Sequence, residues 1–361
     1  MGKMLNFLNN LGKKKEKPEK EDEIPQKKKE KDWLLTSKEK KEETRLDKEI
    51  SSFLEAYYEK INLYGPRHFS GLAYSALVEL GASPATEQEL IDNAKNEKKL
   101  LKRLVEKSFH IGYNFQIQGL AENPAFFHIQ SDKLQFQDKN KLRRIYITCN
   151  NGNVAKLAEK LLQYNCNDNF YLKFCSNSSI KRHSRNEKIV IYCQPKELDY
   201  INQLLNYTEQ KHPELFKESK KVLPFLKRFN HITSFAKTPS KDRFINLNGE
   251  HLRYGESANS LISEILRDSY QETFLEIARR DKKLSEEKLS MMANGTYSIE
   301  KISAKNIPYV LSEYKTYLLE SMKAKMQILS AKNNFEIAGI HSNLRGDSTS
   351  KQKQSKKHTR D

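Results

Sequence analysis

A strand–helix–strand pattern in the middle of the chain restricts the possible folds more than any other feature. Arg144–Cys149 and Asn169–Cys175 are short runs rich in β-branched and aromatic residues, which favour β-strands. Between them, apolar residues recur at helical spacing over residues 154–162. A helix that joins two strands within about 30 residues is typical of a crossover connection. We therefore expect both strands in one sheet, running parallel to each other.

The segments on either side complete the predicted fold. Phe126–Ile129 is expected to form a strand. Lys188–Cys193 is expected to form another, as the return arm of a hairpin after the polar loop Ser176–Asn186. Apolar residues at helical spacing predict helices within residues 50–105 and again within 258–330, whereas the region between is rich in Pro and Gly and is expected to be irregular. The fold class that follows is α+β, a small mixed β-sheet wrapped by helices.

Charge and apolar content predict disordered, charged N- and C-terminal tails. Of the 361 residues only 37% are hydrophobic, and the net charge is +17. Residues 11–48 alternate Lys and Glu with almost no apolar periodicity. Such segments cannot offset the entropy that is lost on ordering, so residues 11–48 are expected to be disordered or transiently helical. The predicted organisation is a disordered Lys/Glu-rich arm (1–49), a helical region (50–120), an α+β core (121–281), C-terminal helices (282–340) and a disordered basic tail (341–361).

The part of the chain that is expected to fold is itself basic, because residues 51–340 hold 43 Lys and Arg against 33 Asp and Glu. This excess favours anionic partners: nucleic acid, phosphorylated protein or an acidic membrane surface. No apolar run approaches the roughly 18 residues that a membrane helix needs, so integral membrane association is not expected. Residues 1–10 lack the apolar core of a Sec signal peptide.

Several kinds of site have no motif in this sequence. There is no P-loop, no G-x-G-x-x-G, no H-E-x-x-H and no G-x-S-x-G. The cysteines form no C-x-x-C pair, so neither a zinc finger nor a disulfide framework is predicted. We interpret the three that lie in strand-like runs as small buried side chains in a reducing compartment. No metal and no cofactor is predicted. The four cysteines are Cys149, Cys166, Cys175 and Cys193.

A lysine in the second predicted strand is the first candidate functional residue. Lys173 lies in the middle of an apolar run, where burial is costly unless the ammonium group has a partner. Lys181, Arg182 and Arg185 follow in the next loop. Guanidinium groups hold phosphate oxygens in a fork, so this cluster predicts a phosphate-binding site. The alternative is an edge-strand lysine that opposes aggregation, beside a solvated hairpin tip.

A histidine in the first predicted strand is the second candidate. His128 lies between Phe127 and Ile129. Because imidazole titrates near neutral pH, a histidine that faces a pocket is a candidate general acid. The alternative is a core histidine whose ring is hydrogen-bonded to the backbone.

Five stretches between residues 143 and 278 carry a resemblance to a known family. They are Arg144–Cys149, Asn169–Cys175, Arg185–Tyr192, Pro224–Pro239 with its Phe-Ala-Lys-Thr-Pro end, and Tyr254–Ser257 ahead of a long helix. In these stretches the chain resembles the HopA family of bacterial type III effectors, whose homologous domains also occur with lanthipeptide and thioamitide biosynthesis genes. The resemblance covers somewhat over a third of the chain.

More distantly, this family is similar to the effector phosphothreonine lyases, which eliminate phosphate from phosphothreonine without a cofactor. In those enzymes a strand lysine removes the α-proton, a histidine protonates the leaving oxygen, and arginines hold the phosphate. The resemblance implies Lys173 as the base, His128 as the acid and Arg185 as a phosphate ligand. It also implies Tyr192, on the next strand, as a third catalytic residue. The second lysine that precedes the histidine in the lyases is missing here, where residues 124–127 are Pro-Ala-Phe-Phe.

Three functions stay open at this point, and with them the question whether the chain is an enzyme. The leading hypothesis is a HopA-like effector that is made in the bacterial cytoplasm, meets a secretion chaperone through its N-terminal region, and is secreted into a host cell. There it binds or modifies a phosphorylated protein.

The alternative is a carbon–oxygen lyase that acts on phosphoserine or phosphothreonine, either in a host protein or, as a cytoplasmic enzyme, in a lanthipeptide-type precursor peptide. The third hypothesis is a nucleic-acid-binding protein. The net charge of the chain and its 17 Tyr and 17 Phe are compatible with nucleic-acid binding. The sequence, however, lacks both the paired RNP aromatics and a basic recognition helix.

Overall fold

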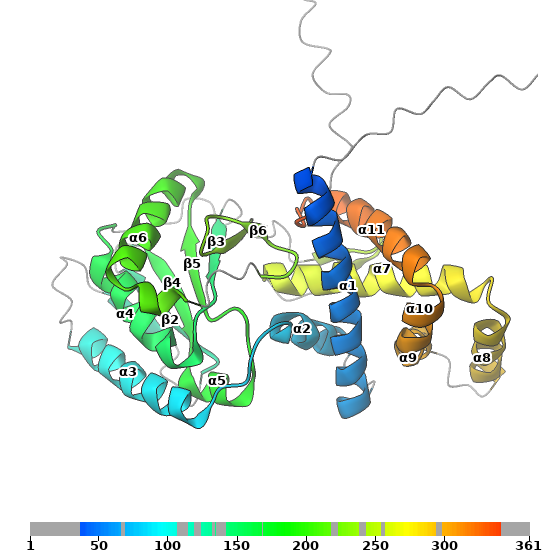
Figure 1. Ribbon diagram of the computed structural model, residues 1–361, viewed down its shortest axis with the longest axis horizontal. Helices are drawn as coiled ribbons and strands as arrows, with labels where there is room; N and C mark the ends of the chain where they lie inside the picture. The colour runs from blue at the N-terminus through cyan, green and yellow to red at the C-terminus, as the bar shows by residue number, and fades with distance from the viewer. Residues whose placement is uncertain are drawn as a thin grey trace, which may run out of the picture.

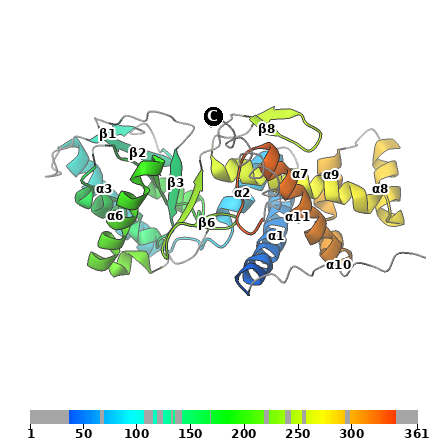
Figure 2. The same cartoon turned by 90° about the horizontal axis from the view of Figure 1, so that it is seen from above.

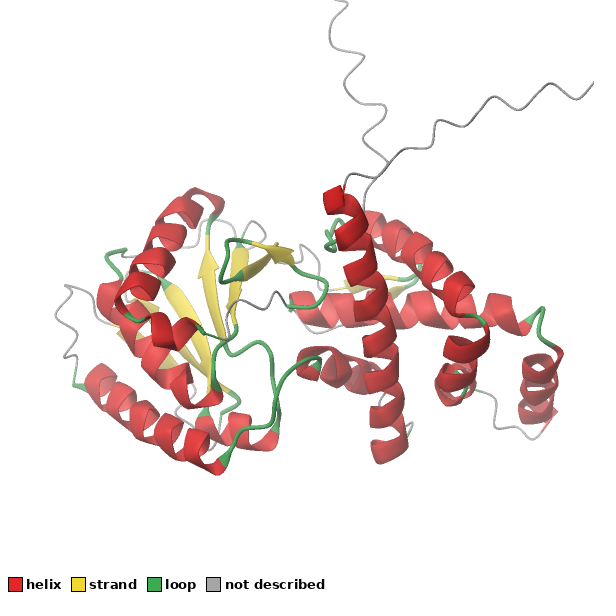
Figure 3. Cartoon of the chain, viewed as in Figure 1, coloured by secondary structure: helices red, strands yellow, loops and turns green. Residues whose placement is uncertain are grey.

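The structure, a computed structural model, describes residues 37–65, 69–106, 115–118, 124–131, 134, 142–167, 169–217, 223–237, 243–253, 257–293 and 298–340. The helices are α1 Ser37–Tyr64, α2 Phe69–Glu79, α3 Glu87–Val105, α4 Val154–Tyr164, α5 Asn177–Arg182, α6 Leu198–Lys211, α7 Ala258–Ala278, α8 Lys282–Ala293, α9 Ile299–Lys305, α10 Ile307–Glu313 and α11 Lys315–Lys332. The strands are β1 Phe115–Gln118, β2 Phe126–Ser131, β3 Arg143–Ile147, β4 Tyr171–Cys175, β5 Ile189–Cys193, β6 Lys227–Arg228, β7 Ser234–Lys237, β8 Arg243–Ile245 and β9 His251–Arg253. The predicted α+β class is confirmed, and Figure 3 shows the helices in red and the strands in yellow.

Among the described residues, seven strands form one sheet in the order β1-β2-β4-β5-β3-β7-β6, and β8 pairs with β9 apart from it. Every neighbouring pair in the sheet is antiparallel. The predicted hairpin is present as β4 and β5. The strands β3 and β4 both run antiparallel to β5, so they are parallel to each other as predicted, but β5 lies between them.

The two faces of the sheet pack into two different hydrophobic cores. Because side chains alternate along a strand, Ile145 and Ile147 of β3 point into one core and Tyr146 points into the other. The first core contains apolar residues of α3, α4 and α6, whereas the second contains those of α1, α2, α7 and α9–α11. Figure 1 shows the corresponding sheet lobe and helical lobe side by side, and Figure 2 shows the same division from above.

The two hydrophobic cores do not correspond to the segments that were predicted from the sequence. Helices α1 and α2 belong to the helical lobe, whereas α3, which follows them in the chain, covers the sheet. Helix α7 contacts α2 and α11, so the segments before and after the sheet pack together. The helical lobe is therefore built from both ends of the described chain.

The prediction of a disordered arm over residues 1–49 is wrong for the last part of that range, because α1 begins at Ser37. Leu46 is buried. Arg45 donates to the carbonyl of Leu226, and the backbone N–H of Phe225 donates to Glu49. Contacts with Leu226 and Phe225, next to β6, therefore help to hold the part of α1 around Arg45 and Glu49 in place. Residues 1–36 and the predicted tail 341–361 lie outside the described residues.

Two segments expected to lack regular structure contain some. The polar loop 176–186 includes α5, and its first turn is capped because the Ser176 hydroxyl accepts the N–H of Ser179. The irregular stretch 213–256 contributes β6 and β7 to the sheet, and β8 and β9 to the separate hairpin. None of the described helices is both long enough and apolar enough to span a membrane.

Candidate functional site

One face of the sheet carries most of the residues that the sequence singled out. We define the candidate face as Phe126 and His128 of β2, Tyr171 and Lys173 of β4, and Tyr192 of β5. The first four are half-buried, and Tyr192 is buried. The residues that alternate with them are apolar, fully buried and packed with α4 and α6. The other face of these strands is thus fixed by the core, which leaves the candidate face at the surface next to the helical lobe.

Lys173 lies opposite His128 in the β2–β4 register, and opposite Val190 on β5. The strand β4 is therefore an interior strand, and the alternative of an edge-strand lysine is wrong. The Nζ atom of Lys173 lies 4.2 Å from the centre of the Phe126 ring. Within the part of the chain that the structure describes, this ammonium group makes no hydrogen bond and no ion pair. Among the described groups, the Phe126 ring is thus the one that stabilises its charge.

Arg185 brings a second cation to the same ring. Its guanidinium carbon lies 5.4 Å from the centre of the Phe126 ring. One of its terminal nitrogens lies 3.4 Å from Glu187 Oε1, which is a long ion pair. The Nε atom of Arg185 is buried and has no hydrogen-bond partner among the described residues. Arg185 therefore keeps donor capacity that the described protein groups do not use.

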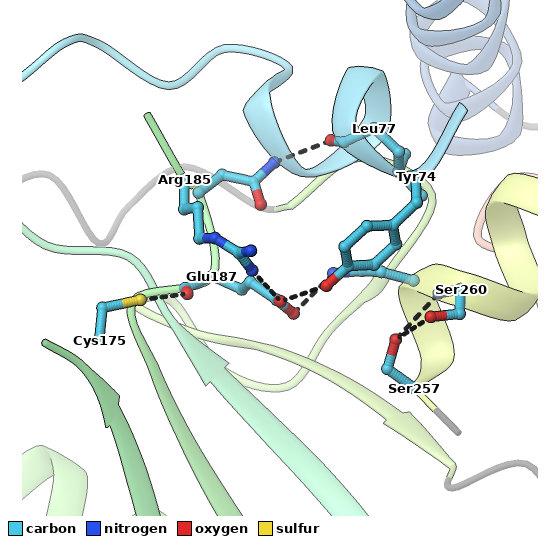
Figure 4. A network of polar contacts seen from close by, with 9 residues as sticks. Tyr74, Leu77, Cys175, Arg185, Glu187, Ser257 and Ser260 are labelled. Atoms are coloured by element: carbon cyan, nitrogen blue, oxygen red, sulfur yellow. Dashed lines mark hydrogen bonds and ion pairs between the residues drawn. The ribbon is translucent and has the colours of Figure 1, made fainter. Parts of the chain in front are cut away.

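Glu187 joins the candidate face to the helical lobe (Figure 4). Its carboxylate is 1% exposed and accepts hydrogen bonds from the hydroxyl of Tyr74 on α2, at 3.0 Å, and from the amide of Asn259 on α7, at 2.9 Å. Burial, and then the negative charge of Glu187, raise the pKa of Tyr74, so its hydroxyl keeps the proton that it donates. A buried carboxylate needs such partners, and here they come from two helices far apart in the chain.

The neighbouring residue Asn186 ties the same loop to the end of α2. Its side-chain amide donates to the carbonyls of Leu77 and Leu80, and its backbone N–H donates to Val78 at 2.8 Å. These bonds satisfy carbonyls that a helix end leaves without intrahelical partners. The loop that carries Arg185 and Glu187 is thus held between sheet and helices, which is unlike the solvated hairpin tip considered from the sequence.

A chain of ring contacts runs from His128 along the candidate face. The Nδ1 atom of His128 lies 2.6 Å from the hydroxyl oxygen of Tyr171. The Tyr171 ring stacks on Tyr192, with centroids 4.4 Å apart and 17° between the planes. The guanidinium of Arg144 lies 5.2 Å from the centre of the Tyr192 ring. His128 thus bonds to a side chain and is not the backbone-bonded core histidine of the alternative.

Burial sets the proton-binding properties of this chain of residues. Burial, and after it the charge of Lys173, hold the pKa of His128 below its usual range, so the neutral imidazole is favoured. Burial, with a smaller effect of Tyr192, raises the pKa of Tyr171 to about 12. At neutral pH both groups are therefore uncharged, and the charges near the face belong to Lys173, Arg185, Arg144 and Glu187.

The other predicted phosphate ligands lie apart from this arrangement. Lys181 and Arg182 are exposed in the last turn of α5, and Arg182 donates from Nε to the carbonyl of Ser178. Sequence reasoning did not single out Phe126, Glu187 or Tyr171 as functional. Because side chains alternate along a strand, the sequence of β4 places Tyr171 on the same face as Lys173. This pattern could have indicated Tyr171 as a site residue.

Other features of the described chain do not add to the site. A cavity of about 570 Å³ lies at the start of α1 and the β6–β7 hairpin, lined by Arg45, Lys227 and Arg228 among others, and includes none of the predicted site residues. No group of His, Cys, Asp or Glu within the described residues is arranged to hold a metal ion. Cys149, Cys175 and Cys193 are buried as expected, whereas Cys166 is exposed.

Comparison with solved structures finds effector proteins of Pseudomonas syringae among the matches. An effector protein from Pseudomonas syringae pv. syringae strain 61 has a TM-score of 0.46 and 12% identity, over 84% of this chain and 96% of that one. An effector protein from Pseudomonas syringae pv. tomato strain DC3000 has a TM-score of 0.38 and 14% identity, over 71% and 98%. This chain is thus distantly similar in structure to bacterial effector proteins. No protein-family model and no curated protein matches the chain, and membership of the HopA family stays a prediction.

Proposed function

We propose that the chain is a secreted, HopA-like effector whose candidate face binds the phosphate group of a phosphorylated host protein. The observation that carries this proposal is the position of two cations, Lys173 and Arg185, over the one Phe126 ring. A phosphate dianion that bridges them would relieve their mutual repulsion and give Lys173 an ion-pair partner.

Two further properties of the face support a phosphate ligand. The guanidinium of Arg185, whose side chain is 17% exposed, suits the fork geometry in which two oxygens of one phosphate are held. The half-buried positions of His128, Tyr171 and Lys173 allow a peptide side chain to approach while water is partly excluded. In such surroundings a charge-assisted hydrogen bond is stronger than it is in bulk water.

The effector part of the proposal rests on the sequence resemblance. The structure does not describe the residues and partners that export, chaperone binding at the N-terminal region and delivery to a host cell would involve. These steps are proposals that an export assay with N-terminal truncations would test.

One observation favours the carbon–oxygen lyase as a second candidate function. His128 and Lys173 are register partners, so an acid and a base would stand side by side on one face, as elimination requires. The lowered pKa of His128 counts against this function at neutral pH, because the imidazole then lacks the extra proton of a good general acid. Binding without turnover is therefore the better-supported function.

Calorimetry with matched peptides and mass spectrometry of the recovered peptide test both functions together. The peptide set contains a phosphothreonine, a phosphoserine and an unphosphorylated version of one sequence. We expect binding of the phosphorylated forms only, with peptide mass unchanged after incubation. Loss of the mass of phosphoric acid would establish the lyase instead. Absence of any preference for the phosphorylated forms would refute both, and oligonucleotides in the same assay address the nucleic-acid hypothesis.

A further inference from the structure

The contact between His128 and Tyr171 determines which nitrogen of the imidazole carries the proton. A neutral histidine has one N–H and one bare nitrogen, and the hydrogen bond at one nitrogen fixes the state of the other. The 2.6 Å distance between His128 Nδ1 and the Tyr171 hydroxyl oxygen fits a single short hydrogen bond. Its direction follows from acid and base strengths. A phenol is the stronger acid and an imidazole nitrogen the stronger base, so the tyrosine donates.

The groups around His128 favour the same arrangement. Lys173 and Tyr171 face it from β4, and its register partner on β1, Gln118, does not titrate. The charge of Lys173 disfavours a second proton on the imidazole. Beyond Tyr171 lie Tyr192, which stacks on its ring, and Arg144, which lies over the Tyr192 ring.

We propose that Tyr171 is a positioning residue that fixes His128 as the Nε2–H tautomer, and that His128 thereby offers a neutral N–H donor to a ligand oxygen beside Lys173. Among the described residues Nε2 has no hydrogen-bond partner, so this donor is left for the ligand. The ligand in this proposal, a phosphate monoester, rests on the proposed function. The tautomer is a property of the free protein and does not depend on it.

The same pair opposes acid catalysis by His128 at neutral pH. If the Nε2–H bond broke to protonate a leaving oxygen, Nδ1 would have to take the Tyr171 proton to avoid an imidazolate. The tyrosine would then end as a phenolate, which its pKa of about 12 makes unfavourable. Tyr171 thus makes His128 a hydrogen-bond donor for binding and at the same time a poor proton donor for elimination.

Nitrogen-15 NMR of the histidine-labelled full chain tests the tautomer directly, without a ligand. At about pH 7.5 we expect the signals of His128 to show a bare Nδ1 and a protonated Nε2. In Tyr171→Phe the ring and its stacking remain but the donor is lost, so both tautomers should be populated. The matched control is Tyr164→Phe, which removes the hydroxyl that lies 2.9 Å from His212 Nε2 and should leave His128 unchanged. A protonated Nδ1 in the wild type, or an unchanged tautomer in Tyr171→Phe, would overturn the assignment.

Titration with a phosphothreonine peptide supplies the second readout. Tyr171→Phe should bind the peptide about twofold more weakly than wild type at about pH 7.5, because only part of its His128 population then carries the proton on Nε2. The ratio of the two affinities should approach one as the pH is lowered far enough to protonate His128 fully, because a doubly protonated imidazole donates from both nitrogens in either protein. An equal affinity at pH 7.5, or a ratio that does not change with pH, would overturn the positioning role. If the wild type binds no phosphopeptide, the proposed function fails, while the NMR result still decides the tautomer.

Discussion

His128 and Lys173 are register partners on the antiparallel strands β2 and β4, so their side chains leave the same face of the sheet as direct neighbours. This pairing places a cation beside a half-buried imidazole. The position of Arg185 over the Phe126 ring adds a second cation, whose carboxylate partner Glu187 is bound to the helical lobe. Ligand binding at this face and the packing of the two lobes are therefore expected to affect each other.

The burial of His128, and after it the charge of Lys173, predict a pH-dependent stability. The folded protein holds the pKa of His128 below the value of about 6.5 that it has in the unfolded chain. Between these two values the unfolded chain binds more protons, so the free energy of unfolding must fall as the pH drops through this window. In His128→Asn this contribution is absent. Denaturant melts from about pH 7.5 to pH 5 should thus show the wild type losing stability relative to the variant, and parallel curves would contradict the placement of His128.

Replacement of Arg185 should separate phosphate binding from stability. Arg185→Lys keeps a positive charge beside Glu187 but loses the guanidinium fork, so we expect about tenfold weaker phosphopeptide binding with little change in melting temperature. Arg185→Ala leaves the buried carboxylate without its cation and should lower the free energy of unfolding by ~3 kcal/mol. Arg182→Ala, at an exposed position on α5, should change neither quantity much. Calorimetry of the three variants measures the change in affinity, and thermal melts measure the change in stability.

Neutralising Glu187 should have opposite effects on affinity and stability. Glu187→Gln removes the anion that competes with a phosphate for Arg185, so phosphopeptide affinity should rise. The variant disturbs the bonds from Tyr74 and Asn259 and should lose about 1–3 kcal/mol of stability. Tyr74→Phe is the control, since it removes one of these bonds without changing a charge and should lower stability only. If both variants bind the peptide like wild type, Glu187 does not compete with the ligand.

The first turns of α1 should contribute to folding although their sequence is rich in Lys and Glu. Leu46 is 2% exposed, so Leu46→Ala should cost ~2–5 kcal/mol through lost burial and the cavity that is left. Leu63 lies on the same helix but is 71% exposed, and Leu63→Ala should change stability by no more than about 0.5 kcal/mol. Urea melts of the two variants provide the comparison. Equal effects would mean that the start of α1 does not pack.

Local patterns in the sequence predicted the elements of the sheet well. The runs around Ile145, Leu172 and Ile191 alternate or are apolar throughout, and such patterns depend on neighbouring residues only. The order of the strands was not predictable in the same way, because it depends on pairing between distant segments. The position of β5 between β3 and β4 is what makes Lys173 an interior residue, and no local pattern indicates it.

The candidate site was predictable in part. Lys173, His128 and Arg185 were singled out by residue type and position, and the structure places Lys173 and Arg185 over the Phe126 ring and His128 opposite Lys173. The family resemblance indicates Arg185 rather than Arg182, but no local pattern indicates the ion pair with Glu187 that distinguishes their surroundings. The partners of Glu187 are 113 and 72 residues away along the chain, so neither periodicity nor spacing could reveal them.

Lys173→Gln tests the central claim, that this face binds phosphate, most directly. The change removes the one charge that lies opposite His128 while keeping a side chain of similar length, and Lys196→Gln at an exposed position serves as the control. Calorimetry should give at least tenfold weaker binding of the phosphothreonine peptide for Lys173→Gln, unchanged binding for Lys196→Gln, and no binding of the unphosphorylated peptide. Equal affinity of wild type and Lys173→Gln for the phosphopeptide would contradict the account.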